Sequence, residues 1–253
     1  MNEPWIVHAA SACGALHERL GLPCQDAHAY AMVGEVAIAA VADGMGSAEH
    51  AELGATCAVG RVIVHLQRWL ADTVPDTEED WCALMQSAFV LTRVDLEQRA
   101  SELGLPLRSL ATTLLTVVMT PDWLITAQIG DGAIVALGFE AEIVLVSRPQ
   151  RGEYANETWP LTAPDAAAVA QYSAHRRAVR GVALFTDGLQ NLALNEARGE
   201  PFAPFFRHLF GGLTRFSGDD LGRFLRSPRV RSRTDDDTTL LLAARRESYG
   251  TRD

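Results

Sequence analysis

Short apolar runs alternate with longer helical patterns along the chain. Residues 29–33 and 36–42 are apolar and separated by a Gly-Glu pair, which predicts two antiparallel strands joined by a tight turn. Residues 49–71 and 78–103 carry apolar side chains at helical spacing and predict two long helices. The first half of the chain therefore combines a hairpin with two helices long enough to cover a sheet.

The middle of the chain returns to strand patterns. Four apolar runs joined by short turns predict an antiparallel meander, over residues 110–119, 123–129, 133–137 and 142–146. The next segment, about 147–180, is polar and carries three prolines, so we expect a variable, flap-like region with a helix around 165–175.

The last part repeats the order of strand and helices. Residues 181–186 predict a buried strand, helical segments follow to about residue 225, and residues 238–244 predict a closing strand. Strands and helices in separate blocks are typical of an α+β protein rather than of alternating βαβ units. A chain of 253 residues with 48% hydrophobic side chains predicts a single domain over 1–253.

Charge and composition exclude several functions. The net charge of -10 argues against nucleic acid as a partner. The basic residues are all arginines, so reactions that need a lysine amine are excluded. The first residues resemble neither a signal peptide nor a membrane span, and the four cysteines form no C-x-x-C pair. We expect a cytoplasmic protein with reduced thiols and no membrane contact.

Four aspartates stand where apolar strands meet turns: Asp43, Asp131, Asp187 and Asp236. Three of them precede a glycine, which permits close approach of the backbone. Gathered carboxylates repel one another, and a hard divalent cation such as Mg²⁺ or Mn²⁺ is the simplest way to stabilise them. An EF-hand, a histidine or cysteine zinc site, a G-x-S-x-G elbow and a G-x-G-x-x-G loop all fail on spacing.

Six strings in order carry a family resemblance: CQDAHAY, AVADGMGSAEHAELGA, SLATTLLTVV, AQIGDGAIVAL, ALFTDGLQNL and DDDTTLLL. Together they resemble the metal-dependent protein phosphatases of type 2C, in particular their short bacterial branch. The resemblance implies a four-layer αββα sandwich, with two central antiparallel β-sheets flanked by helices. It also implies a binuclear Mg²⁺ or Mn²⁺ centre that activates water to hydrolyse phosphoserine or phosphothreonine.

The resemblance assigns roles to individual residues. Asp43 would bridge the metals, Gly44 would offer its carbonyl, and Asp187 and Asp236 would complete the catalytic carboxylates. The choice of Asp236 among its aspartate neighbours rests on its distance from Thr239.

Two further aspartates have weaker matches. Asp131 corresponds to the family aspartate of a third, weaker metal site. Asp26 corresponds to an acidic residue that reaches the metal centre through water or from behind the ligands.

The chain also departs from the family. Gly21 stands where better-known members have a phosphate-binding arginine, and Met45 stands where eukaryotic members have a histidine after Asp-Gly. Arg19 and His17 are the nearby candidates for substrate binding, beside structural interpretations of both.

The sequence therefore predicts a serine/threonine phosphoprotein phosphatase that works beside a cognate kinase in bacterial signalling. Two alternatives stay open. One is a catalytically weak, phosphatase-like regulatory module, and the other is a phosphatase of small phosphomonoesters.

Overall fold

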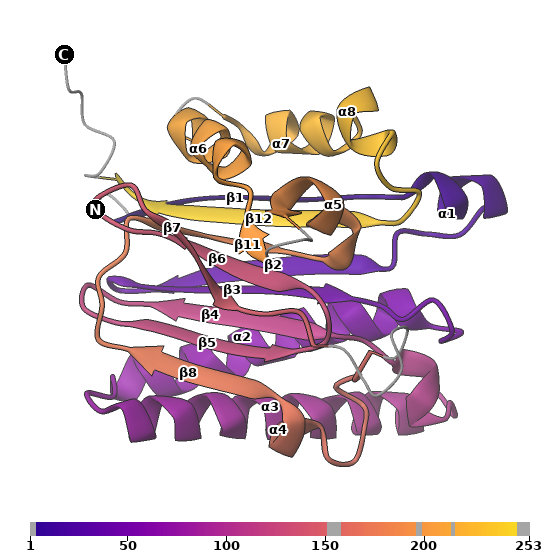
Figure 1. Ribbon diagram of the computed structural model, residues 1–253. Helices are drawn as coiled ribbons and strands as arrows, with labels where there is room; N and C mark the ends of the chain where they lie inside the picture. The colour runs from indigo at the N-terminus through magenta and orange to yellow at the C-terminus, as the bar shows by residue number, and fades with distance from the viewer. Residues whose placement is uncertain (1–3, 151–157, 196–198, 214–215, 247–253) are drawn as a thin grey trace.

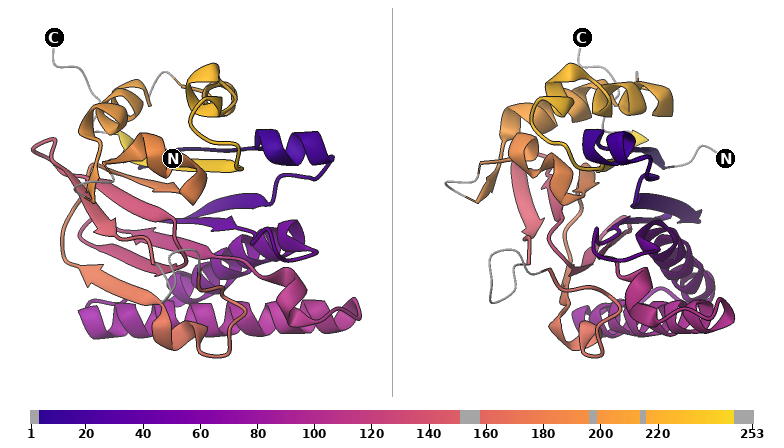
Figure 2. Two further views of the ribbon diagram at one scale, coloured as in Figure 1. Left: turned by 45° about the vertical axis from the view of Figure 1, so that its right-hand side comes forward. Right: turned by 90° about the vertical axis from the view of Figure 1, so that its right-hand side faces the viewer.

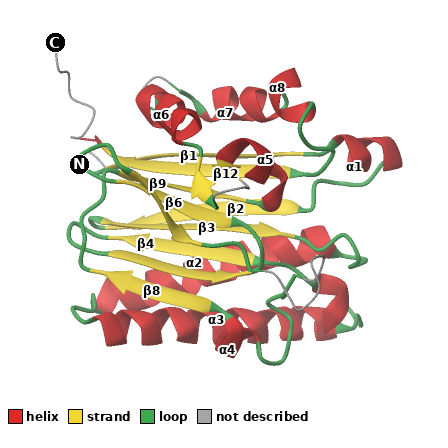
Figure 3. Cartoon of the chain, viewed as in Figure 1, coloured by secondary structure: helices red, strands yellow, loops and turns green. Residues whose placement is uncertain are grey.

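The computed structural model describes residues 4–150, 158–195, 199–213 and 216–246. Two five-stranded sheets are stacked face to face, with helices on the outer side of each (Figures 1 and 3). This four-layer αββα arrangement confirms the predicted α+β fold.

The first sheet has the order β2-β3-β4-β5-β8, and all its pairs are antiparallel. Its strands are β2 (Asp26–Val33), β3 (Val36–Asp43), β4 (Leu114–Met119), β5 (Leu124–Ile129) and β8 (Gln171–His175). The predicted hairpin is present, because Val33 pairs with Val36 around a turn in which Gly34 has a φ of 58°.

The second sheet has the order β1-β12-β9-β6-β7 and is also antiparallel. Its strands are β1 (Trp5–Ala12), β12 (Thr238–Arg245), β9 (Gly181–Phe185), β6 (Ala133–Leu137) and β7 (Ile143–Ser147). The first and last strands of the chain therefore pair with each other.

Helices cover both outer faces (Figure 2). The first sheet packs against α2 (Ala51–Asp72) and α3 (Glu78–Glu102). The second packs against α6 (Ala203–Gly212), α7 (Gly218–Leu225) and α8 (Pro228–Arg231). The short elements are α1 (Ala15–Leu20), η1 (Leu107–Leu110), α4 (Ala166–Val169), η2 (Asp187–Leu189), α5 (Gln190–Ala193), β10 (Leu194–Asn195) and β11 (Glu200–Pro201). Among the helices of the described ranges, none has both the length and the apolar character needed to cross a bilayer.

The unbroken apolar runs of the central strands follow from burial on both faces. In β3, Ile38 and Ala40 pack toward the helices, whereas Ala39 and Val41 pack between the sheets. The sandwich consequently has three apolar layers, one between the sheets and one under each set of helices.

Two local predictions are wrong. The runs after residue 110 do not form one meander, because β4 and β5 lie in the first sheet and β6 and β7 in the second. The chain changes sheets at Gly130, whose φ of 106° is rarely adopted by other residues. The predicted helix at 165–175 is the single turn of α4 followed by β8, an edge strand of the first sheet. Residues 151–157 of the expected flap lie outside the described residues.

Candidate metal centre

The four aspartates of the sequence analysis lie at one end of the sandwich. Asp43 ends β3, Asp131 lies in the crossover from β5 to β6, Asp187 follows β9, and Asp236 precedes β12. Because neighbouring strands are antiparallel, the end of one strand lies beside the start of the next. Strand pairing thus brings residues distant in sequence to the same end of the fold.

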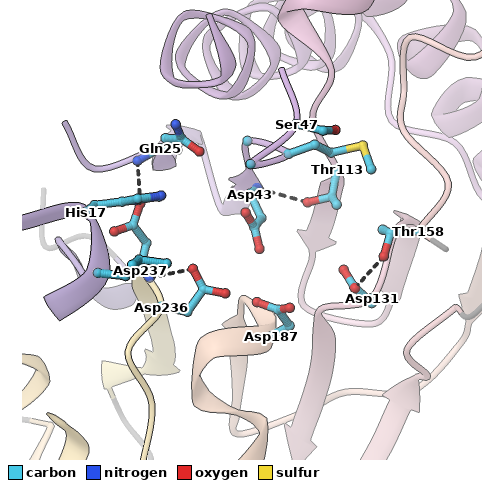
Figure 4. A pocket seen from close by; sticks show the side chains of 14 residues that line it. His17, Gln25, Asp43, Ser47, Thr113, Asp131, Thr158, Asp187, Asp236 and Asp237 are labelled. Atoms are coloured by element: carbon cyan, nitrogen blue, oxygen red, sulfur yellow. Dashed lines mark hydrogen bonds and ion pairs between the residues drawn. The ribbon is translucent and has the colours of Figure 1, made fainter. Parts of the chain in front are cut away.

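Three of these carboxylates form a close group. One oxygen from each of Asp43, Asp131 and Asp187 lies within 4.8 Å of the others. Asp236 lines the same pocket, which has a volume of about 300 Å³, and its side chain lies beside the group (Figure 4). The described lining is completed by Leu16, His17, Gln25, Gly44, Met45, Gly46, Ser47, Thr113, Thr158 and Asp237.

Backbone contacts with the strand behind it fix Asp43. Its N–H donates to Thr113 Oγ1 at 2.9 Å, and its carbonyl accepts from the Thr113 N–H at 2.8 Å and from Thr112 Oγ1 at 3.0 Å. The next residue, Gly44, lies so close to α2 that an added Cβ would be 2.6 Å from the carbonyl oxygen of Ala51. Glycine is thus required by close packing, and Asp43 is held at a defined point.

Asp237 anchors the chain beside the pocket. Its Oδ1 accepts from the Gly14 N–H at 2.7 Å, and its Oδ2 accepts from the Gln25 N–H at 2.6 Å. The same Oδ2 lies 2.9 Å from His17 Nδ1. The Asp237 side chain is only 3% exposed, so its oxygens are occupied by the protein. Asp236, the preceding residue, also lines the pocket, and fewer hydrogen bonds hold its side chain. Its Oδ1 accepts from the Asp237 N–H at 2.8 Å.

Asp26 lies behind the pocket rather than in its described lining. It pairs with Asp43 across β2 and β3, is 7% exposed, and accepts a hydrogen bond from Thr186 Oγ1 at 2.8 Å. Its other oxygen, Oδ1, is buried without a hydrogen-bond partner, as is Oδ1 of Asp187. These orphaned oxygens are suited to a cation or to ordered water.

The electrostatics of the site favour a bound cation. Burial, with help from neighbouring carboxylates, raises the pKa of Asp187 to about 6 and that of Asp26 to about 8. The same causes raise the pKa of Asp43 well above its usual value and raise that of Asp236. None of the described lining residues is an arginine, and the sequence contains no lysine. Oxygen ligands without a basic partner fit Mg²⁺ or Mn²⁺.

The two residues expected to bind substrate differ in position. His17 lines the pocket, and its side chain is 13% exposed. Arg19 is not in the described lining; its side chain is 65% exposed and its guanidinium lies 4.0 Å from Asp235. The structure therefore brings His17, but not Arg19, to the acidic pocket.

Sequence reasoning missed several residues of the site. Asp131 accepts a hydrogen bond from Thr158 Oγ1 at 2.6 Å and, through its carbonyl, one from Gln190. Thr158 lies outside the six strings and Gln190 lies in the fifth, but no sequence signal links either residue to Asp131, and only the fold brings them together. Asp237 gave a faint signal, since it follows Asp236 in a run of three aspartates.

The sandwich thus carries at one end an acidic pocket whose oxygen ligands fit a divalent cation, as in a metal-dependent enzyme. The sequence profile of the family described as Protein phosphatase 2C matches residues 13–226. The chain is also 35% identical over 255 residues to Serine/threonine-protein phosphatase 3 of Escherichia coli (strain K12), covering 94% of this chain and 98% of that protein. The chain belongs to the protein phosphatase 2C family. It is a metal-dependent protein phosphatase, and its substrates are phosphoproteins.

Solved structures share the fold. The catalytic domain of the serine/threonine protein phosphatase PstP, in complex with two manganese ions, superposes with a TM-score of 0.63 at 18% identity and covers 95% of this chain and 97% of that one. The serine/threonine phosphatase Stp1 of Staphylococcus aureus has a TM-score of 0.64 at 14% identity, with 94% of each chain covered.

Proposed function

We propose that this chain hydrolyses phosphoserine and phosphothreonine in proteins with two divalent cations, Mn²⁺ or Mg²⁺, held in the acidic pocket. The carboxylate group of Asp43, Asp131 and Asp187 carries the proposal, because its oxygens lie within 4.8 Å of one another, the described lining holds no arginine, and its histidine, His17, is paired with Asp237. The 35% identity to a serine/threonine phosphatase supports the substrate class.

The proposed metal ligands are chosen by where each oxygen lies and by whether it already accepts a hydrogen bond within the protein. Asp43, Asp187 and Asp236 supply carboxylate oxygens from three different strand ends, and Gly44 supplies its carbonyl. Asp131, which already accepts a hydrogen bond from Thr158, belongs to a third and weaker metal site. When bound, divalent cations lower the pKa of water and offset negative charge on a phosphoryl group.

Protein groups around the ligands have positioning roles. Thr112 and Thr113 hold the backbone of Asp43, so its carboxylate stays at the end of β3. Asp26 is paired with Asp43 behind the pocket and offers a further buried carboxyl oxygen close to the site, without lining the pocket.

His17 is the proposed substrate-binding group. Asp237 Oδ2 accepts from the Nδ1 side of its ring, so in the protonated imidazolium form the opposite Nε2–H donates a hydrogen bond to a phosphoryl oxygen. No described arginine lines the pocket to perform this task. In the cell we expect a cytoplasmic enzyme that opposes a cognate serine/threonine kinase.

The test is hydrolysis of a phosphothreonine peptide and of p-nitrophenyl phosphate, with Mn²⁺, Mg²⁺ or EDTA. We expect turnover of both that requires the metal. Turnover of small phosphomonoesters alone would favour the small-molecule phosphatase, and metal binding without any turnover would favour the regulatory module.

A further inference from the structure

A second pocket of about 720 Å³ opens beside the acidic one. The two pockets share Met45 and Ser47, which lie in the loop after β3. A molecule whose phosphate reaches the acidic pocket can therefore extend directly over this shared wall into the second pocket.

The second pocket is suited to a peptide segment. Its walls come from η1 and its flanks, from α3 and from residues 160–164, and they include the prolines Pro106, Pro160 and Pro164. Leu107 and Ala163 add further apolar surface. Concave surfaces of this kind, apolar with a few polar groups, favour the binding of apolar groups in a defined orientation.

One cation in this pocket lacks a partner. The Arg108 side chain is exposed and, among the described residues, forms neither an ion pair nor a hydrogen bond. Arg93 is already engaged, because its Nε donates to the Ala163 carbonyl at 2.9 Å and its Nη1 lies 3.6 Å from Glu97. Arg108 is therefore the group available to a ligand.

We propose that this second pocket binds the substrate segment next to the phosphorylated residue and selects an acidic side chain opposite Arg108. This inference rests on the proposed phosphatase function. The chain has a net charge of -10, so most of its surface repels acidic segments. The unpaired Arg108 beside the acidic pocket attracts an acidic side chain at that one place. Glu49, exposed in the same pocket, disfavours further acidic residues and so confines the preference to one position.

The test compares phosphothreonine peptides in which one aspartate, or one lysine in its place, is moved position by position along both flanks. For the native protein with Mn²⁺, we expect one position at which aspartate raises kcat/KM about fivefold over lysine, the size of a typical exposed ion pair. Arg108→Glu should abolish or reverse this ratio. Arg68→Glu is the matched control, because Arg68 is exposed on α2, lines neither pocket and undergoes the same change of charge.

The outcomes separate this inference from the function on which it rests. The binding of an acidic flank is overturned if the ratio of kcat/KM for aspartate over lysine is the same at every position, or if Arg108→Glu and Arg68→Glu change this ratio equally. Either result leaves the proposed phosphatase function standing. If the native protein shows no metal-dependent turnover of p-nitrophenyl phosphate, the phosphatase function itself is overturned. Thermal unfolding of both variants verifies that each is folded.

Discussion

Asp26 and Asp43 are directly paired across the antiparallel strands β2 and β3, so two carboxylates lie side by side at the end of one sheet. Burial is the main cause that raises the pKa of both groups; the charge of Asp26 adds to the rise at Asp43, and the charges of Asp237 and Asp187 add to the rise at Asp26. The protein tolerates this pairing because the same end of the fold can hold a divalent cation.

The stability of the metal-free protein should therefore fall as the pH rises. A carboxyl whose folded pKa exceeds its unfolded value of about 3.9 stabilises the fold while it is protonated. That contribution is present below about pH 4 and is lost as the pH passes the folded values, about 6 for Asp187 and about 8 for Asp26. Thermal unfolding in EDTA measures this loss of stability. The melting temperatures are compared between pH 6 and 8, because at lower pH the protonation of other carboxylates changes stability in the opposite direction.

Mn²⁺ should reverse this trend, because protons and cations compete for the same oxygens. We expect Mn²⁺ to raise the melting temperature more at pH 8 than at pH 6 and to bind more tightly at pH 8 by calorimetry. An equal Mn²⁺ affinity at both pH values would contradict the cation site described here.

Asp236 and Asp237 should respond in opposite ways to the same substitution. Asp236→Asn removes a charge from the pocket, so we expect a loss of Mn²⁺ affinity of at least tenfold and no loss of metal-free stability. Asp237→Asn keeps one acceptor oxygen but turns the other into an NH2 donor that faces a buried N–H group, and should lower the free energy of unfolding by about 2 kcal/mol. The reverse pattern would assign the metal to Asp237.

Gly188→Ala should damage the site through packing alone. An added Cβ would lie 2.0 Å from the carbonyl oxygen of Asp237, so the segment that carries Asp236 must shift. We expect a loss of about 1–3 kcal/mol in the free energy of unfolding together with weaker Mn²⁺ binding. Gly60→Ala is the control, since its Cβ meets nothing within 4 Å on the exposed face of α2 and should stabilise the helix by about 0.5–1 kcal/mol. Equal effects of both changes would contradict the packing argument.

His17→Gln should lower kcat/KM for phosphopeptides about tenfold without changing Mn²⁺ affinity, because the ring lines the pocket while Asp237 keeps its two backbone donors. Arg19→Gln is the matched control and should leave kcat/KM unchanged, since Arg19 is exposed outside the described lining. A large loss in Arg19→Gln with none in His17→Gln would restore the arginine as the phosphate-binding group.

The predictable part of this fold is the part governed by local patterns. The helices α2 and α3 and the hairpin of β2 and β3 were predicted to within a few residues, because their apolar spacing is long and regular. The pairing of β1 with β12 was not predicted, since no local signal links the two ends of a chain. The switch of sheets between β5 and β6 was missed for the same reason, because a short Gly-Asp-Gly turn is equally compatible with a hairpin.

The candidate site likewise contains residues that the sequence indicates and residues that only the fold reveals. Asp43, Asp131, Asp187 and Asp236 were visible because each interrupts an apolar strand pattern. The partners that position them, such as Thr158 on Asp131 and Thr186 on Asp26, come from other elements and became evident only in three dimensions. Sequence thus indicates the charged groups, whereas packing decides how each is held.

The most direct test of the metal centre is Mn²⁺-dependent hydrolysis of a phosphothreonine peptide by the native protein, Asp43→Asn and Asp187→Asn. Both side chains belong to the close carboxylate group, and both variants should keep the melting temperature of the metal-free protein or raise it. We predict native turnover that EDTA abolishes, with a loss of at least a hundredfold in each folded variant. Undiminished turnover in either folded variant would contradict the assignment of these carboxylates to the metals.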